Sequence, residues 1–197
     1  MTLQPQLHAV MEKLSNNEGD TLEIDKAWIT KAGEDFAASL DRQFTRRDDE
    51  FRLRASNMGK SLCQLQMAKS GAVAERKDYN FIMRMLHGDA IEVIMDLLLK
   101  IAKANITGGK SKIALDLGDT IIKGEDDIHI DNKVYDIKSS APYSFDLKWK
   151  KGLDALKSDD PFGYIGQLVG YSVAQDLDTG GWIVVCKSTG QVVVVDA

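Results

Sequence analysis

Two apolar segments near the end of the chain constrain its fold more than any other feature. Residues 182–187 and 191–195 are almost continuously apolar, and a polar turn at 188–190 separates them. Strands with one face in water alternate apolar and polar residues, whereas strands covered on both faces are apolar throughout. A helical pattern at 163–175 comes before these strands. We therefore predict an α/β protein in which helices cover both faces of a sheet.

The other predicted elements place helices before most of the strands. Asp25 can cap a helix that runs to about Phe44, and Ser56 can cap another that runs to about Ser70. The segment 46–50 is a charged connector. The predicted helices cover about 3–15, 25–44, 56–70, 79–104 and 163–175, and the predicted strands about 112–117, 120–124, 127–131, 133–138, 182–187 and 191–195. This order predicts an N-terminal helical extension at 1–53 and a core at 54–197, with a mixed central β-sheet flanked by helices.

Composition restricts the class of protein. The 197 residues are 44% hydrophobic and 28% charged, which is ordinary for a globular protein. No apolar run reaches the ~18 residues that span a bilayer, and residues 1–6 lack the features of a secretion signal. Cys63 and Cys186 form no metal-type pair, as expected in a reducing compartment. These features predict a cytoplasmic protein without a membrane segment.

The net charge of −5 is unevenly distributed along the chain. Residues 45–112 hold 13 Lys and Arg against 8 Asp and Glu, whereas residues 113–197 hold 8 against 14. A protein that binds nucleic acid needs a basic approach surface, not a basic whole chain. The acidic total therefore does not exclude a nucleic-acid partner.

Two carboxylates and a lysine lie on adjacent predicted strands that are joined by a polar turn. Asp127 begins the first strand, and Asp136 and Lys138 end the second. Because side chains alternate along a strand, Asp136 and Lys138 project from one face and Ile137 from the other. Carboxylates from neighbouring strands can hold Mg²⁺, which prefers oxygen ligands, with the lysine beside a bound water. Such an arrangement is suited to the hydrolysis of phosphodiesters.

Two further motifs accompany this pair of strands. Gly88 and Glu92 lie one turn apart on a long apolar helix, and Gln167 and Tyr171 lie one turn apart on the helix after the lysine strand. Together, in this order, these residues resemble the signature of the PD-(D/E)XK nuclease superfamily, in its RecB-like and lambda-exonuclease-like branch. The resemblance covers about residues 54–195. It implies a restriction-endonuclease-like core and a metal-dependent nuclease activity.

The resemblance also implies roles for individual residues. Asp127, Asp136, the Ile137 carbonyl and Glu92 are the expected ligands of one or two Mg²⁺ or Mn²⁺ ions. Lys138 is expected to orient or deprotonate the attacking water or to offset developing charge, and the sequence does not choose among these roles. No iron–sulfur cluster is expected, because the four cysteines of the iron–sulfur relatives are absent.

Other residues are candidates for contact with substrate. Gln167 could hydrogen-bond the lysine or the water, which places it in the predicted catalytic set. The expected DNA contacts are Arg54, Ser56, Lys60, Arg84, Lys148, Lys150, Lys151 and Tyr171. Trp149, among these lysines, could stack on a base or pack in the core.

Simpler interpretations remain open for several of these residues. Asp126 is an alternative ligand; Asp127 is preferred because Ile128 and Ile130 then alternate with it as core residues. Asp136 and Lys138 could form a plain surface ion pair, and Glu92 could be a solvated helix acid. Gly109, Lys110 and Ser111 resemble the end of a phosphate-binding loop, but residue 104 is alanine and a strand follows.

The predicted function is that of a metal-dependent DNA nuclease. Its small size favours an exonuclease that serves phage DNA recombination or degradation, acting in the host cytoplasm if it is phage-encoded. The alternatives are a structure- or sequence-selective endonuclease and a catalytically silent nucleic-acid-binding protein on a nuclease scaffold. DNA is the expected partner, and a recombination or single-strand-binding protein and a homo-oligomer are further expectations.

Overall fold

The computed structural model of the protein describes residues 3–45, 51–72 and 78–197. The charged connector predicted at 46–50 lies outside these ranges. The α-helices are α1 Leu3–Ser15, α2 Lys26–Phe44, α3 Leu62–Lys69, α4 Tyr79–Ile101, α5 Pro142–Leu147, α6 Leu153–Ser158 and α7 Tyr164–Gln175, and the 3₁₀ turns are η1 Gly19–Thr21, η2 Ala55–Asn57 and η3 Trp149–Lys151. The strands are β1 Ile106–Gly108, β2 Lys112–Asp116, β3 Ile121–Glu125, β4 Ile128–Ile130, β5 Lys133–Ser140, β6 Asp178–Cys186 and β7 Val192–Asp196.

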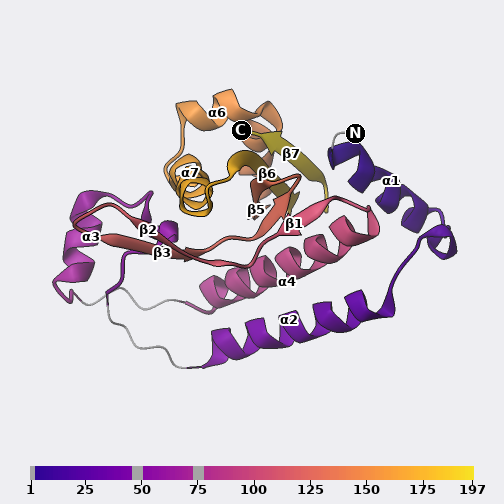
Figure 1. The fold of residues 1–197 in the computed structure, drawn as a ribbon, viewed down its shortest axis with the longest axis horizontal. Helices are drawn as coiled ribbons and strands as arrows, with labels where there is room; N and C mark the ends of the chain where they lie inside the picture. Colours follow the sequence, from indigo (N-terminus) through magenta and orange to yellow (C-terminus); the bar gives the residue numbers. More distant parts are fainter. Residues whose placement is uncertain (1–2, 46–50, 73–77) are drawn as a thin grey trace.

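Within the described ranges, five strands form a mixed sheet in the order β1-β4-β5-β6-β7. β5 and β6 are parallel, and the other neighbouring pairs are antiparallel. β2 and β3 form a separate hairpin that projects beyond this sheet (Figure 1). α2 and α4 lie on one side of the sheet, and α6 and α7 lie on the other (Figure 1). The predicted α/β fold, with a mixed sheet flanked by helices, is confirmed.

β6 joins the two hydrophobic cores of the protein. Every residue from Gly180 to Cys186 is buried, as the apolar run predicts. Trp182 and Val184 belong to the core that includes α7, whereas Ile183 and Val185 belong to the core that includes α4. Because successive side chains point to opposite faces, one strand supplies both cores. Each fully buried aliphatic side chain contributes about 1.5–3 kcal/mol, so β6 holds the two layers together.

The N-terminal helices pack against the rest of the fold. Asp25 caps α2 as predicted, and its carboxylate accepts a hydrogen bond from the Ala27 N–H at 2.8 Å. α2 lies alongside α4 (Figure 1), and Gln43 Nε2 donates to Asp89 Oδ2 at 2.8 Å across this contact. α1 packs against α4 and β7 through Leu7, which is fully buried. α1 and α2 therefore pack on the same side of the fold as α4.

One predicted helix start is wrong. Ser56 lies in η2 and caps no helix, and α3 begins only after Ser61, which forms a capping box with Gln64. A tertiary contact explains the difference, because a Cβ placed on Gly59 would lie 1.9 Å from the carbonyl carbon of Phe162. The backbone before Ser61 is therefore held against the loop that precedes α7, and the helix starts once this contact has been passed.

Other elements were not predicted. β1 adds an edge strand, and α5, η3 and α6 fill the segment between β5 and α7. Pro142 stands in the first turn of α5, where its missing N–H leaves no helical hydrogen bond unmade. Among residues 3–45, 51–72 and 78–197, no helix has the length and apolar character required to cross a bilayer.

Candidate metal-dependent active site

The predicted carboxylates meet where β4 ends and β5 continues. Ile128, the first residue of β4, lies opposite Tyr135 in the antiparallel ladder. Asp127 comes directly before β4, and its carboxylate accepts a hydrogen bond from the Ile137 N–H of β5, the residue after Asp136. β5 continues to Ser140. The site therefore lies beside the segment of β5 that extends past β4.

Lys138 and Asp136 form a close ion pair on one face of β5. Lys138 Nζ donates to Asp136 Oδ1 at 2.7 Å and also lies 2.6 Å from Oδ2, so it contacts both carboxylate oxygens. Asp136 is only 1% exposed, so this is not the plain surface pair of the simpler interpretation. Burial opposes the charge of Lys138, but Asp136 and Asp127 outweigh burial and raise the pKa of the ammonium. Lys138 is therefore a firmly charged donor.

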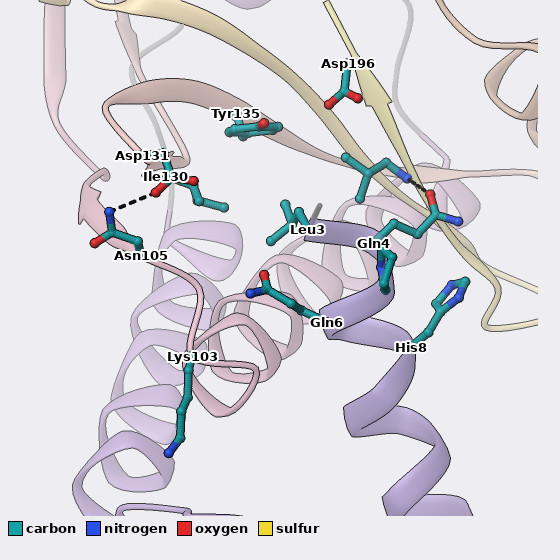
Figure 2. A pocket seen from close by; sticks show the side chains of 12 residues that line it. Leu3, Gln4, Gln6, His8, Lys103, Asn105, Ile130, Asp131, Tyr135 and Asp196 are labelled. Atoms are coloured by element: carbon teal, nitrogen blue, oxygen red, sulfur yellow. Dashed lines mark hydrogen bonds between the residues drawn. The ribbon is translucent and has the colours of Figure 1, made fainter. Parts of the chain in front are cut away.

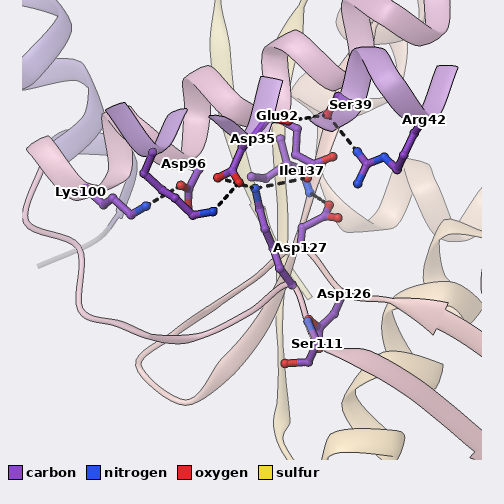
Figure 3. Close-up of polar contacts among 12 residues, drawn as sticks. Asp35, Ser39, Arg42, Glu92, Asp96, Lys100, Ser111, Asp126, Asp127 and Ile137 are labelled. Atoms are coloured by element: carbon purple, nitrogen blue, oxygen red, sulfur yellow. Dashed lines mark hydrogen bonds and ion pairs between the residues drawn. The ribbon is translucent and has the colours of Figure 1, made fainter. Parts of the chain in front are cut away.

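Asp127 is held by the backbone of β5. Its Oδ2 accepts a hydrogen bond from the Ile137 N–H at 2.7 Å (Figure 3). In a strand the N–H and C=O of one residue point toward the same neighbour, so the Ile137 carbonyl is directed to this edge as well. Burial, followed by the charge of Asp136, raises the pKa of Asp127 well above its usual range. A second carboxylate so close to Asp127 makes the site attractive to a cation.

Asp126 is committed to structural contacts. It is 1% exposed, and its Oδ1 accepts from the Ser111 N–H at 2.9 Å. Its Oδ2 lies 2.9 Å from His129 Nε2 and accepts from Gln175 Nε2, also at 2.9 Å. These contacts tie the β2–β3 hairpin, β4 and α7 to one carboxylate. They leave Asp127 as the neighbour that faces Asp136.

Glu92 approaches the same centre from α4. Figure 3 shows Glu92 and Asp35, from α2, on the side where Asp127 meets Ile137. Lys110 Nζ lies 3.9 Å from Glu92 Oε1 and 3.7 Å from Asp35 Oδ2. Burial raises the pKa of Glu92, and the charge of Lys110 opposes that rise. Lys110 was missed in the sequence because it was considered only as part of a rejected phosphate-loop motif, and Asp35 was not singled out among the acids of its helix.

Gln167 and Tyr171 interact with each other on α7. Gln167 Nε2 donates to Tyr171 Oη at 2.8 Å. The Tyr171 ring is 4% exposed and belongs to the core, and burial raises its pKa to about 12. This burial does not support the predicted contact between Tyr171 and a DNA phosphate. Tyr171 instead packs in the core with Val134 of β5, and α7 as a whole lies against β5.

The predicted DNA-contact residues differ in accessibility. Arg54, Ser56, Lys60, Arg84, Lys150 and Lys151 are exposed. Lys148 has a side chain only 13% exposed, and it pairs with Asp159 at 3.0 Å. Lys150 pairs with Asp146 at 2.8 Å. Trp149 is 2% exposed in the core, so it offers no ring to a base.

A basic patch that sequence reasoning only half identified lies past the end of β5. A Cβ placed on Gly88 would lie 3.8 Å from Ser139 Oγ, so α4 runs close to β5 there. The Lys187 N–H donates to the Ser140 carbonyl at 2.9 Å, which places Lys187 beside the same strand end. Burial and the nearby charge of Arg84 both lower the pKa of Lys187. Arg84 and Lys187 are thus neighbouring cations beside the end of β5.

A pocket of about 630 Å³ lies elsewhere, where β5 begins (Figure 2). Its wall includes the start of α1, with Gln4 and His8, together with Tyr135 and Asp196. None of the predicted site residues lines it.

Comparison with known proteins assigns no family. No protein-family model matches the chain, and no curated protein matches its sequence. A solved structure described as "Crystal structure of SSO0001" is similar at 15% sequence identity with a TM-score of 0.46. The match covers 82% of this chain and 75% of that chain. A likeness this distant says nothing of what the present protein does.

Proposed function

We propose that this protein is a divalent-metal-dependent deoxyribonuclease that hydrolyses phosphodiester bonds, with exonuclease action as the preferred mode. One observation supports the proposal: Asp127 Oδ2 accepts from the Ile137 N–H beside Asp136, and Lys138 Nζ contacts Asp136 on the same strand. The arrangement brings two carboxylates and an ammonium together beside the part of β5 that extends past β4. The resemblance in motif order points to the same chemistry.

The donor set suits a hard cation. Asp127, Asp136 and the Ile137 carbonyl offer oxygen only, although both oxygens of Asp136 already contact Lys138 Nζ. Across the described residues, no group of three or more His, Cys, Asp or Glu is arranged to hold a metal. Mg²⁺ needs no such group, because it is often held by one or two carboxylates while water completes its coordination shell, and we expect the same of Mn²⁺ here. When bound, such an ion lowers the pKa of a coordinated water and offsets charge on the phosphate.

The protein's own groups supply positioning and charge. Lys138, as an ammonium, can donate to a phosphate oxygen or to the attacking water, and its fixed place allows it to stabilise the charge that develops on the phosphate. Asp136 and the ring of Tyr164, 5.7 Å from Nζ, hold it there. Arg84 and Lys187 would bind the backbone of the same DNA strand beyond the cleaved bond.

A specific contact favours a second candidate function. Lys138 reaches both oxygens of Asp136, so the pair is neutralised internally. A catalytically silent DNA-binding protein could retain such a pair for structure alone. The endonuclease alternative differs from the proposal only in whether a DNA end is required.

The test is cleavage of end-labelled linear duplex DNA beside closed circular DNA, with Mg²⁺, Mn²⁺ or EDTA. We expect metal-dependent loss of the linear DNA alone, and the fate of the label gives the polarity. Asp136→Asn and Lys138→Met should abolish cleavage, whereas Lys133→Ala, an exposed lysine on the same strand, should not. Nicking of the circle would indicate an endonuclease. Binding of DNA without cleavage of either substrate would favour the silent scaffold.

A further inference from the structure

A tight turn before α7 presents an aromatic ring to solvent. Its four residues are Asp160-Pro161-Phe162-Gly163, and the Gly163 N–H donates to the Asp160 carbonyl at 3.2 Å. Asp first, Pro second and Gly fourth is the residue order that β-turns of type I prefer. The Asp160 carboxylate also joins the turn to the helix, because it accepts from the Tyr164 N–H at 2.9 Å. Phe162, the third residue of the turn, is 65% exposed.

A contact between two backbone segments holds this turn in place. A Cβ on Gly59 would lie 1.9 Å from the carbonyl carbon of Phe162. A Cβ on Gly163, where φ is +69°, would lie 2.5 Å from the Gly59 nitrogen. The two glycines therefore allow an approach that a side chain would block. A ring on a turn fixed in this way loses little freedom when a ligand stacks on it, so the entropic cost of binding is small.

The Phe162 ring adjoins the ring that contacts the Lys138 ammonium. The ring centres of Phe162 and Tyr164 lie 5.5 Å apart, and the Tyr164 ring centre lies 5.7 Å from Lys138 Nζ. Tyr164 is itself packed against the buried Trp149, with ring centres 5.2 Å apart. Phe162 can therefore be no farther from Nζ than the sum of the first two distances, which is about three steps of 3.4 Å along a DNA strand.

The charge around this ring suits a phosphate backbone. Residues 51–72 hold four Lys or Arg and no Asp or Glu. Lys60, in that segment, is exposed and directly follows the glycine that touches the turn. The two acids of the neighbouring chain have partners of their own, since Asp160 caps α7 and Asp159 pairs with Lys148 at 3.0 Å. An exposed ring beside a basic segment is the combination by which proteins bind single-stranded nucleic acid.

We propose that Phe162 stacks on an unpaired base of the DNA strand whose phosphate is bound at Lys138. The inference rests on the proposed function, because it takes DNA as the substrate, but it requires no metal ion. It supplies the base contact that Trp149, buried in the core, does not offer. Because every base has an aromatic face, such a contact would hold a frayed or single-stranded DNA end of any sequence.

The experiment measures the binding of single-stranded DNA in EDTA, where a metal-dependent nuclease cannot cut it. The oligonucleotide carries 5-iodouracil, which forms a photocrosslink to an aromatic side chain that it stacks on, at successive positions from each end. With wild type, we expect a crosslink that mass spectrometry maps to Phe162. Phe162→Ala should lose this crosslink and bind the DNA roughly 5- to 100-fold more weakly, which is the contribution of one base stack.

Two variants serve as controls. Phe162→Trp keeps an aromatic face and should retain both the crosslink and the affinity. Phe44→Ala removes a ring that is 71% exposed on α2, which lies on the other side of the sheet from α7 (Figure 1), and it should behave as wild type. Circular dichroism checks that each variant is folded. Phe162→Leu, which is apolar but has no aromatic face, replaces Phe162→Ala if that protein unfolds.

The other outcomes each overturn a defined claim. An unchanged affinity of folded Phe162→Ala, or a crosslink that maps only to other residues, would overturn the stacking role and leave the nuclease proposal intact. If Phe162→Ala keeps its DNA affinity but changes its mass by light scattering, the ring serves a contact between chains, which also overturns the proposal. No binding of DNA by wild type would overturn both proposals. Stacking without cleavage in Mg²⁺ or Mn²⁺ would overturn the nuclease activity alone.

Discussion

Replacing Asp127 by asparagine should separate the stability of the fold from the binding of metal. The amide oxygen of Asp127→Asn can still accept from the Ile137 N–H, while the charge that faces Asp136 is removed. Asp127→Ala removes both, and an unsatisfied backbone donor costs about 1–3 kcal/mol. At pH 7 in EDTA, we expect Asp127→Asn to be at least as stable as wild type. Asp127→Ala should unfold with a free energy about 1–3 kcal/mol below that of Asp127→Asn.

Adding metal should make wild type more stable than Asp127→Asn, the reverse of their order in EDTA. A ligand at one hundred times its dissociation constant stabilises the folded state by about 2.7 kcal/mol. Wild type should gain this amount from Mn²⁺, and both Asp127 variants should gain little. Urea unfolding in EDTA and in MnCl₂ measures the difference, and the fluorescence of the buried Trp149 and Trp182 reports the transition.

Two results would refute this reasoning. Equal stabilisation of Asp127→Asn and wild type by Mn²⁺ would show that Asp127 is not a ligand. A loss of more than about 1 kcal/mol for Asp127→Asn in EDTA would show that its charge stabilises the fold, contrary to the facing carboxylates. Asp119→Asn, an exposed residue in the β2–β3 turn, is the control for the same change of net charge.

Further outcomes follow from other parts of the structure. The pKa of Asp127 is raised above its unfolded value of about 4, so the folded state holds a proton that the unfolded state has lost. The stability of wild type in EDTA should therefore fall as the pH rises from about 4 through the raised pKa. Asp127→Asn should lack this fall when urea midpoints are measured across the same pH range. Gly88→Ala should keep cleavage and gain up to about 1 kcal/mol in thermal unfolding, because the new methyl meets nothing closer than 3.8 Å in a helix. Gly180→Ala should lose about 1–3 kcal/mol in the same assay, because its Cβ would lie 2.2 Å from an aromatic carbon. Arg84→Ala and Lys187→Ala should each lower the slope of log affinity for DNA against log salt concentration by about one, the loss of one phosphate contact. A fluorescence titration at several salt concentrations measures this slope, and an unchanged slope would show that these residues do not contact the DNA.

The hairpin at the site could be predicted because local signals determine it. Asp131 and Asn132 have φ values of +53° and +58°, which suit the two-residue turn that joins tightly paired strands. That turn sets the register of β4 against β5 and brings Asp127 next to the Ile137 N–H of β5. Continuous apolar character likewise predicted a strand with cores on both faces, and β6 has them.

The parts that were missed depend on contacts between distant segments. Asp35 reaches the site only because α2 packs along α4, and nothing in the helical pattern of α2 distinguishes this acid from the others on it. Lys110 is directed by a loop whose path follows from the backbone of Asp127. The preference of Ser56 for a helix cap was outweighed by the contact between Gly59 and the loop before α7.

The parallel pairing of β5 with β6 has a consequence for the timing of synthesis. Lys138 lies opposite Val184, so the strand that carries the site gains its inner neighbour only after some 46 more residues have been translated. At 5–20 residues per second, that interval lasts roughly 2–9 s. The strand that carries Lys138 therefore has no β6 neighbour until β6 itself has left the ribosome.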